Sequence, residues 1–165
     1  MVATPCRPGE VVLQCRASLN LHFFHHEDGS TVDPQEVIQS LQEFVAGNIG
    51  LTNDVAGADA FPPLFIPIWQ DKFASAMLGS LWADVGKHGV AKLLRAYVRE
   101  HRPVAAVTVL ESWAARDQEK VDTSRSLEGQ PGVYEVVCLC YESLYEQKVW
   151  LAEITGTGSS RILGQ

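Results

Sequence analysis

The chain has 165 residues, 46% hydrophobic and 20% charged, a composition typical of one soluble globular domain and not of a disordered chain. Its formal net charge of −7 argues against sequence-independent nucleic-acid binding, which needs a positive surface. No apolar run approaches the roughly 20 residues that a membrane helix needs, so we expect no membrane partner.

The N-terminus has neither the basic start nor the apolar core of a secretory signal, so we expect a cytoplasmic protein. Residues 1–9 are rich in proline and read as a loose arm of a single domain that spans 1–165. In the cytoplasm, cysteines are expected as thiols and not as bridges. Their spacing does not fit a four-cysteine zinc site, so we interpret them as small buried hydrophobic residues: Cys6, Cys15, Cys138 and Cys140.

Apolar and polar residues alternate from Leu13 to Phe23, which predicts a half-buried strand that ends at the Asp28-Gly29 turn. Asp33-Pro34 predicts the start of a helix, because aspartate caps free amides and proline suits the first helical position. The helical spacing of the apolar residues that follow runs to a stop at Gly47-Asn48.

Residues 47–70 form a long connection, and such loops are usually functional or mobile. Its apolar part, Phe61–Trp69, holds three prolines, which confine it to a sheet edge or to a segment outside any ladder. Residues 71–102 are helical in tendency, and glycines predict two helices with a break near Ala83–Gly89. The second helix ends before Pro103.

The C-terminal part predicts a sheet. Val104–Trp113 is typical of a central strand, residues 115–131 of an exposed loop, and Val133–Tyr141 with Lys148–Ile154 of a hairpin. A short last strand is expected at Arg161-Ile162-Leu163. We therefore expect an α+β fold, with a mixed or mostly antiparallel sheet of four to five strands and two to three helices packed mainly on one face.

This C-terminal part carries a resemblance. The segments Val109-Leu110-Glu111-Ser112-Trp113, Gly132–Cys140 and Arg161-Ile162-Leu163-Gly164 resemble those of small bacterial and phage-type α+β proteins with no assigned activity. Those proteins also carry a Glu-small-Trp strand end, a charged loop and a strand pair. The resemblance covers the C-terminal third to half of the chain and implies the fold only.

The histidine cluster at residues 22–26 is the sharpest candidate for a metal site, because imidazoles bind zinc, nickel, copper and iron. On a strand, His22 and His26 share one face while His25 points away. No second half of a metal motif accompanies them. A polar strand end that runs into a turn therefore explains the cluster better, and we expect no metal and no cofactor.

Two further sets are candidates for binding. Lys92, Arg95 and Arg99 share a helix face with His88 and Arg102, where they could contact phosphates or an acidic partner. A solvated face is the favoured interpretation. Glu111, next to Trp113, interrupts an apolar strand, and burial there would raise its pKa and suit it to acid–base chemistry. We favour instead a position on the less buried face or outside the sheet. Trp113 and the other tryptophans are expected as core or interface anchors.

Two hypotheses of function follow. The first is a non-enzymatic interaction or assembly protein that self-associates into a homo-oligomer, since catalytic motifs are absent and charge is unevenly spread along the chain. The second is a small-ligand-binding protein or metal-dependent enzyme. Its pocket would lie between the sheet and the 47–70 connection, near the histidines at 22–26 and Glu111.

Overall fold

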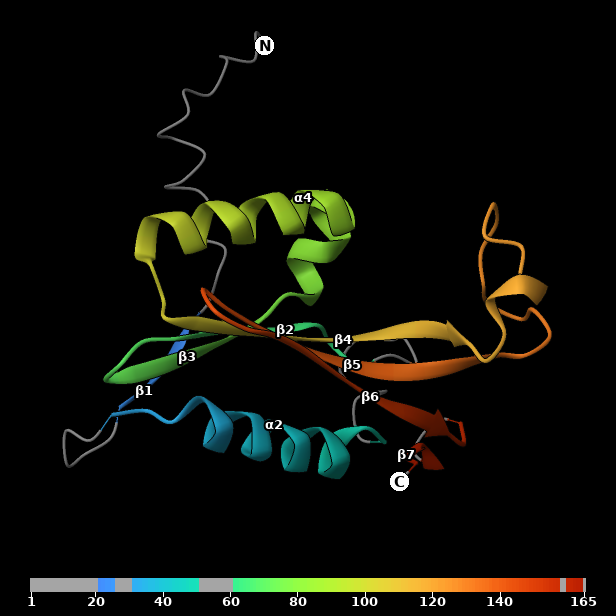
Figure 1. Ribbon diagram of the computed structural model, residues 1–165, viewed down its shortest axis with the longest axis horizontal. Helices are drawn as coiled ribbons and strands as arrows, with labels where there is room; N and C mark the ends of the chain where they lie inside the picture. Colours follow the sequence, from blue (N-terminus) through green and yellow to red (C-terminus); the bar gives the residue numbers. More distant parts are fainter. Residues whose placement is uncertain (1–20, 26–30, 51–60, 158–159, 165) are drawn as a thin grey trace, which may run out of the picture.

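A computed structural model of the chain describes residues 21–25, 31–50, 61–157 and 160–164. One antiparallel sheet runs through the molecule, with a helix on each side (Figure 1). In chain order the elements are β1 (His22–His25), α2 (Pro34–Asn48), β2 (Leu64–Ile68), β3 (Lys72–Met77), α4 (Gly79–His101), β4 (Ala105–Ala115), the short 3-10 helix η1 (Gln118–Lys120), β5 (Val133–Ser143), β6 (Gln147–Thr155) and β7 (Ile162–Leu163).

The described residues form a seven-stranded sheet in the order β1-β3-β2-β4-β5-β6-β7, with every pair antiparallel. The predicted four to five strands are therefore wrong. The packing of the helices mainly on one face is also wrong, because α2 and α4 lie on opposite faces (Figure 1). The reason is that the central strands carry apolar side chains on both faces, so each face needs a cover.

The α2 face holds the larger core. There Val37, Ile38 and Val45 of α2 pack against alternate residues of the central strands, which include Ile66, Val107 and Leu139. The α4 face holds a smaller core built on Phe65, Ala76, Leu78, Val90 and Tyr97. This second core covers β1, β3, β2 and the start of β4, so α4 covers only part of this face of the sheet.

Strand β2 lies inside the sheet, between β3 and β4, although its prolines predicted an edge or a segment outside the ladder. Pro67 pairs with Ala106 of β4, but no bridge joins Ile66 and Pro67 to β3. Proline has no N–H to donate, so a gap in the β3 ladder is the place where a central strand can hold it.

Strand β3 corrects the prediction that the chain is helical from residue 71. The spacing of its apolar residues fits both a helix and a strand. In the structure Phe73 pairs with Ile68 and Met77 pairs with Leu64, so the segment forms a hairpin with β2. The helix begins only at Gly79. Gly86, at φ 66° and ψ 171°, is not helical and divides α4 into two helical segments inside the predicted Ala83–Gly89 break, so that prediction of two helices is confirmed.

Several other local predictions are confirmed. Asp33 caps α2 by accepting a hydrogen bond from the Gln35 N–H at 2.8 Å, and β4, β5, β6 and β7 form where expected. The N-terminal arm, most of the predicted Leu13–Phe23 strand and residues 51–60 lie outside the described residues. Neither described helix has the length and apolar character to cross a membrane.

Candidate functional site

Strand β1 borders a cavity on each face of the sheet. Because side chains alternate along a strand, Leu21 and Phe23 face α4, whereas His22 and Phe24 face α2. Phe23 and Phe24 are each about half exposed, at 50% and 47%, so both cavities are walled in part by aromatic rings that solvent reaches. The two cavities differ in chemistry.

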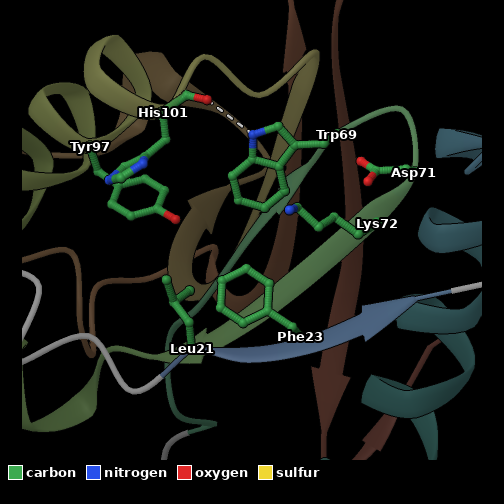
Figure 2. Close-up of a pocket in the computed structure, with 7 residues that line it drawn as sticks. All are labelled: Leu21, Phe23, Trp69, Asp71, Lys72, Tyr97 and His101. Atoms are coloured by element: carbon green, nitrogen blue, oxygen red, sulfur yellow. Dashed lines mark hydrogen bonds between the residues drawn. The ribbon is translucent and has the colours of Figure 1, made fainter.

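The cavity on the α4 side has a volume of about 480 Å³ and is called here the aromatic pocket (Figure 2). It lies between the β1 edge, the β2–β3 turn and the end of α4. Figure 2 shows three aromatic rings around a common space, with the Lys72 ammonium and the Tyr97 hydroxyl directed into it. The lining residues are Leu21, Phe23, Trp69, Asp71, Lys72, Tyr97 and His101.

Paired rings form the walls of the aromatic pocket. Phe23 and Trp69 stack with ring centroids 6.2 Å apart, and Tyr97 and His101 with centroids 4.2 Å apart. The Lys72 Nζ lies 5.9 Å from the Phe23 centroid and 5.7 Å from the Trp69 centroid, within the range of cation–π attraction. The walls therefore already hold one cation against aromatic faces.

The end of α4 is tied to the β2–β3 turn at this point. The Trp69 Nε1–H donates to the His101 carbonyl oxygen at 3.0 Å, and the Trp69 N–H donates to the Lys72 carbonyl oxygen at 2.8 Å. Arg102 ends the helix in the left-handed conformation, with φ 45° and ψ 54°. These contacts fix Trp69 relative to His101, so the pocket is built before any ligand arrives.

One polar atom in this wall has no partner. The His101 Nε2 is buried and makes no hydrogen bond. A buried polar atom costs about 1–3 kcal/mol when it is left unsatisfied, but this nitrogen has almost no accessible surface and so offers no contact to a ligand in the pocket. Lys72 adds a positive charge, and the rings add stacking surfaces, so the pocket offers sites for an anionic group and for a planar ring.

The cavity on the α2 side has a volume of about 520 Å³ and is mainly apolar. Phe24 and Phe73 stack on its floor with centroids 4.9 Å apart, and Phe44 and Met77 are exposed at 51% and 66%. His22 is one of its few polar lining residues, with Asp33, Glu36, Ser40 and Ser75. Of the residues in the ligand-pocket hypothesis, His22 lines this cavity and Glu111 lines neither cavity beside β1, so the hypothesis remains a prediction.

Glu111 lies elsewhere, in a buried ion-pair cluster. Its Oε2 is 2.8 Å from Arg161 Nη2, and its Oε1 accepts a hydrogen bond from the Phe61 N–H at 2.6 Å. The same Arg161 nitrogen is 3.2 Å from Glu135 Oε1. The Arg161 and Glu111 side chains are only 2% and 9% exposed, so the favoured position of Glu111 on a less buried face or outside the sheet is wrong.

Burial raises the pKa of Glu111 above its ordinary value, and its contacts with Arg161 and the Phe61 N–H only partly oppose that effect. The expected direction of the pKa is therefore confirmed. Glu111 lines neither cavity beside β1. The cluster ties β7 to β4 and β5, so its evident role is to hold the sheet together.

The other predicted binding residues that the structure describes lie apart from both cavities. Lys92, Arg95 and Arg99 are exposed on α4, and Trp113 is 38% exposed on β4. His26 lies outside the described residues, and nothing is described of the His25 side chain. Among the described residues, no three His, Cys, Asp or Glu side chains lie close enough to hold a metal ion.

Cys138 and Cys140 carry free thiols on the α4 face of β5. Burial raises the pKa of both thiols, so they are held as neutral groups at neutral pH and not as nucleophilic thiolates. Sequence reasoning missed the aromatic pocket, because its residues come from separate segments. The only signal was the polar pair Asp71-Lys72 directly after a buried apolar run. No family model, no curated protein and no solved structure matches this chain.

Proposed function

We propose that the protein binds a small molecule in the aromatic pocket, and that the ligand is a planar ring system with an acidic group. The observation that carries this proposal is the Lys72 ammonium, whose Nζ lies 5.9 Å from the Phe23 ring centroid and 5.7 Å from the Trp69 ring centroid in the lining of the pocket. Small-molecule sites are usually apolar concavities with a few polar groups that fix the ligand's orientation, and this pocket has that form.

The chemistry of the walls selects the ligand class. A planar ring gains stacking contact with Phe23 and Trp69, whose ring planes are 30° apart. An acidic group gains an ion pair with Lys72, whose ammonium is directed into the pocket (Figure 2). A cationic ligand is disfavoured, because Lys72 already lies against the rings.

The test compares two fluorescent probes with similar rings and different charge. Anilinonaphthalene sulfonate carries an acidic sulfonate, and phenylnaphthylamine lacks it. Binding of each is measured by fluorescence titration on folded protein. We expect the sulfonate probe to bind, and Lys72→Met to weaken it about three- to tenfold, since one solvent-accessible ion pair contributes up to about 1 kcal/mol and tenfold is about 1.4 kcal/mol. The uncharged probe should be affected much less.

Two matched controls locate the binding. Lys92→Met removes an equal charge from the exposed face of α4 and should leave both affinities unchanged. Met77→Ser changes the α2-side cavity and should also leave the sulfonate probe unaffected. Loss of binding in Met77→Ser, or equal affinities in Lys72→Met and the parent protein, would refute the aromatic pocket as the site.

A further inference from the structure

Strand β6 has an open edge. In the described part of the chain, β7 pairs with β6 at Ile154 and Thr155, the Gly164 N–H bonds to the Glu153 carbonyl oxygen, and no described residue pairs with the same edge from Gln147 to Ala152. An open edge presents unpaired N–H and C=O groups to any strand that approaches it. Val149 and Leu151 on this strand are 55% and 59% exposed, so the edge is also apolar.

The backbone alternation of β6 shows which groups face outward. The Glu153 carbonyl oxygen accepts a hydrogen bond from the Gly164 N–H at 2.7 Å, so it lies on the β7 side. The pairing of β6 with β5 is regular from Glu153 to Gln147, without a bulge. Every second residue therefore points its backbone groups the same way, and Val149 and Leu151 present their N–H and C=O groups to the open edge.

These groups fit an antiparallel copy of the same strand. If a two-fold axis passes at Val149, Val149 lies opposite Val149 of the other copy, Gln147 of each copy lies opposite Leu151 of the other, and these pairs can exchange N–H···O bonds. If the axis passes at Trp150 instead, Gln147 lies opposite Glu153, whose carbonyl is already bonded to Gly164. The backbone thus favours the axis at Val149.

The side chains agree with this register. Val149 of one copy meets Val149 of the other on the α4 face, beyond the part that α4 covers. Lys148 lies opposite Trp150, and Glu146 lies opposite Ala152, so no like charges face each other directly. The register also brings the β5–β6 turn, where Leu144 and Tyr145 are 87% and 96% exposed, toward β7 of the second copy, where Ile162 is 62% exposed.

We infer that the protein forms a two-fold dimer in which β6 pairs with β6 of a second copy and the sheet continues across both. This dimer is independent of the aromatic pocket, which lies at the β1 end of the sheet. Its occupant is a second copy because the edge is complementary to itself in hydrogen bonds and apolar side chains and places no like charges opposite each other.

The test combines sedimentation with residue-resolved hydrogen exchange. We expect a dimer at micromolar concentration, with the Val149 and Leu151 amides protected and their protection lost on dilution. The neighbouring Trp150 and Ala152 amides point to β5 and should stay protected at every concentration. A chain that sediments as a monomer, or a dimer whose Val149 and Leu151 amides exchange freely, would overturn the inference.

Two proline variants provide a matched pair. Leu151→Pro removes an outward N–H, which costs the monomer no ladder bond but blocks the second copy, so it should sediment as a folded monomer. Ala152→Pro removes an N–H bonded to β5 and should lower the unfolding temperature. Should Leu151→Pro itself fail to fold, Val149→Lys supplies the same readout by charge repulsion across the axis. A folded Leu151→Pro or Val149→Lys variant that remains dimeric would contradict β6 pairing.

Discussion

Replacement of Arg161 by methionine should destabilise the protein far more than its place directly before a two-residue strand suggests. The change leaves the Glu111 carboxylate buried without its cation. Removal of one partner of a buried ion pair costs about 3–5 kcal/mol. We expect about 3 kcal/mol in the free energy of unfolding, the lower end of that range, because the other acid in the cluster, Glu135, is 29% exposed and regains water.

The matched control is Arg116, which also lies 2.8 Å from a glutamate oxygen, that of Glu153. Its side chain is 68% exposed, so Arg116→Met should cost no more than about 1 kcal/mol. Both variants are measured by urea unfolding at neutral pH. If Arg161→Met costs no more than Arg116→Met, the reasoning from burial is wrong.

The cost of Arg161→Met should depend on pH in a defined direction. Burial raises the pKa of Glu111, and without Arg161 the main opposing influence is gone, so the pKa in the folded variant rises further. A raised carboxyl pKa favours the folded state while the group is protonated, and this stability is lost as the pH rises through the folded pKa. The cost should therefore shrink from neutral pH toward the ordinary value of 4.5.

The double variant Glu111→Gln/Arg161→Met removes both charges and keeps an acceptor for the Phe61 N–H. It should recover most of the lost stability, because replacement of both partners of a buried pair by neutral groups is often close to neutral. A double variant as unstable as Arg161→Met would show that the arginine acts through packing and not through charge.

Three further predictions follow from local geometry. Asp33→Ala removes the cap of α2 and should cost about 1 kcal/mol in thermal unfolding, whereas Asp33→Asn, which keeps the acceptor, should cost little. Gly156→Ala should cost at least about 1 kcal/mol, because φ is 86° there and a Cβ would collide with the Ser160 carbonyl oxygen; an unchanged unfolding temperature would contradict this. Simultaneous change of the basic α4 residues to glutamate should leave probe affinity and sedimentation unchanged if they form only a solvated face; the residues are Lys92, Arg95 and Arg99.

Much of the local structure could be predicted from the sequence because its causes are local. Asp33-Pro34 both begins and caps α2, and the β-branched run after Pro103 forms β4 as expected. The helix predicted over β3 was wrong because Phe73 and Met77 suit both periodicities. Only the pairing of this segment with β2, a tertiary contact, decides between them.

The sites were harder to predict because the residues that form each site are distant from one another along the chain. The pKa of Glu111 was expected to rise if it was buried, but its partner Arg161 lies 50 residues further on and was expected only as part of a terminal strand. The aromatic pocket joins Trp69 to His101 through a side-chain-to-backbone hydrogen bond that no motif encodes. The predicted self-association and the resemblance to small bacterial and phage-type proteins remain predictions.

The strand order has a consequence for the folding rate. β2 pairs with β3, and β4, β5 and β6 pair in succession, so these are two local units that can form early. Among the described strands, the two units join at the seam between β2 and β4, where Leu64 pairs with Val109. The whole of α4 lies between these two residues in the sequence. Chain entropy opposes such long-range closure, so we expect the seam to form late and to place folding in the slow range of milliseconds to seconds. Until the seam forms, the inner edges of β2 and β4 stay open. Refolding at high protein concentration should therefore give a lower yield, because chains aggregate at that step.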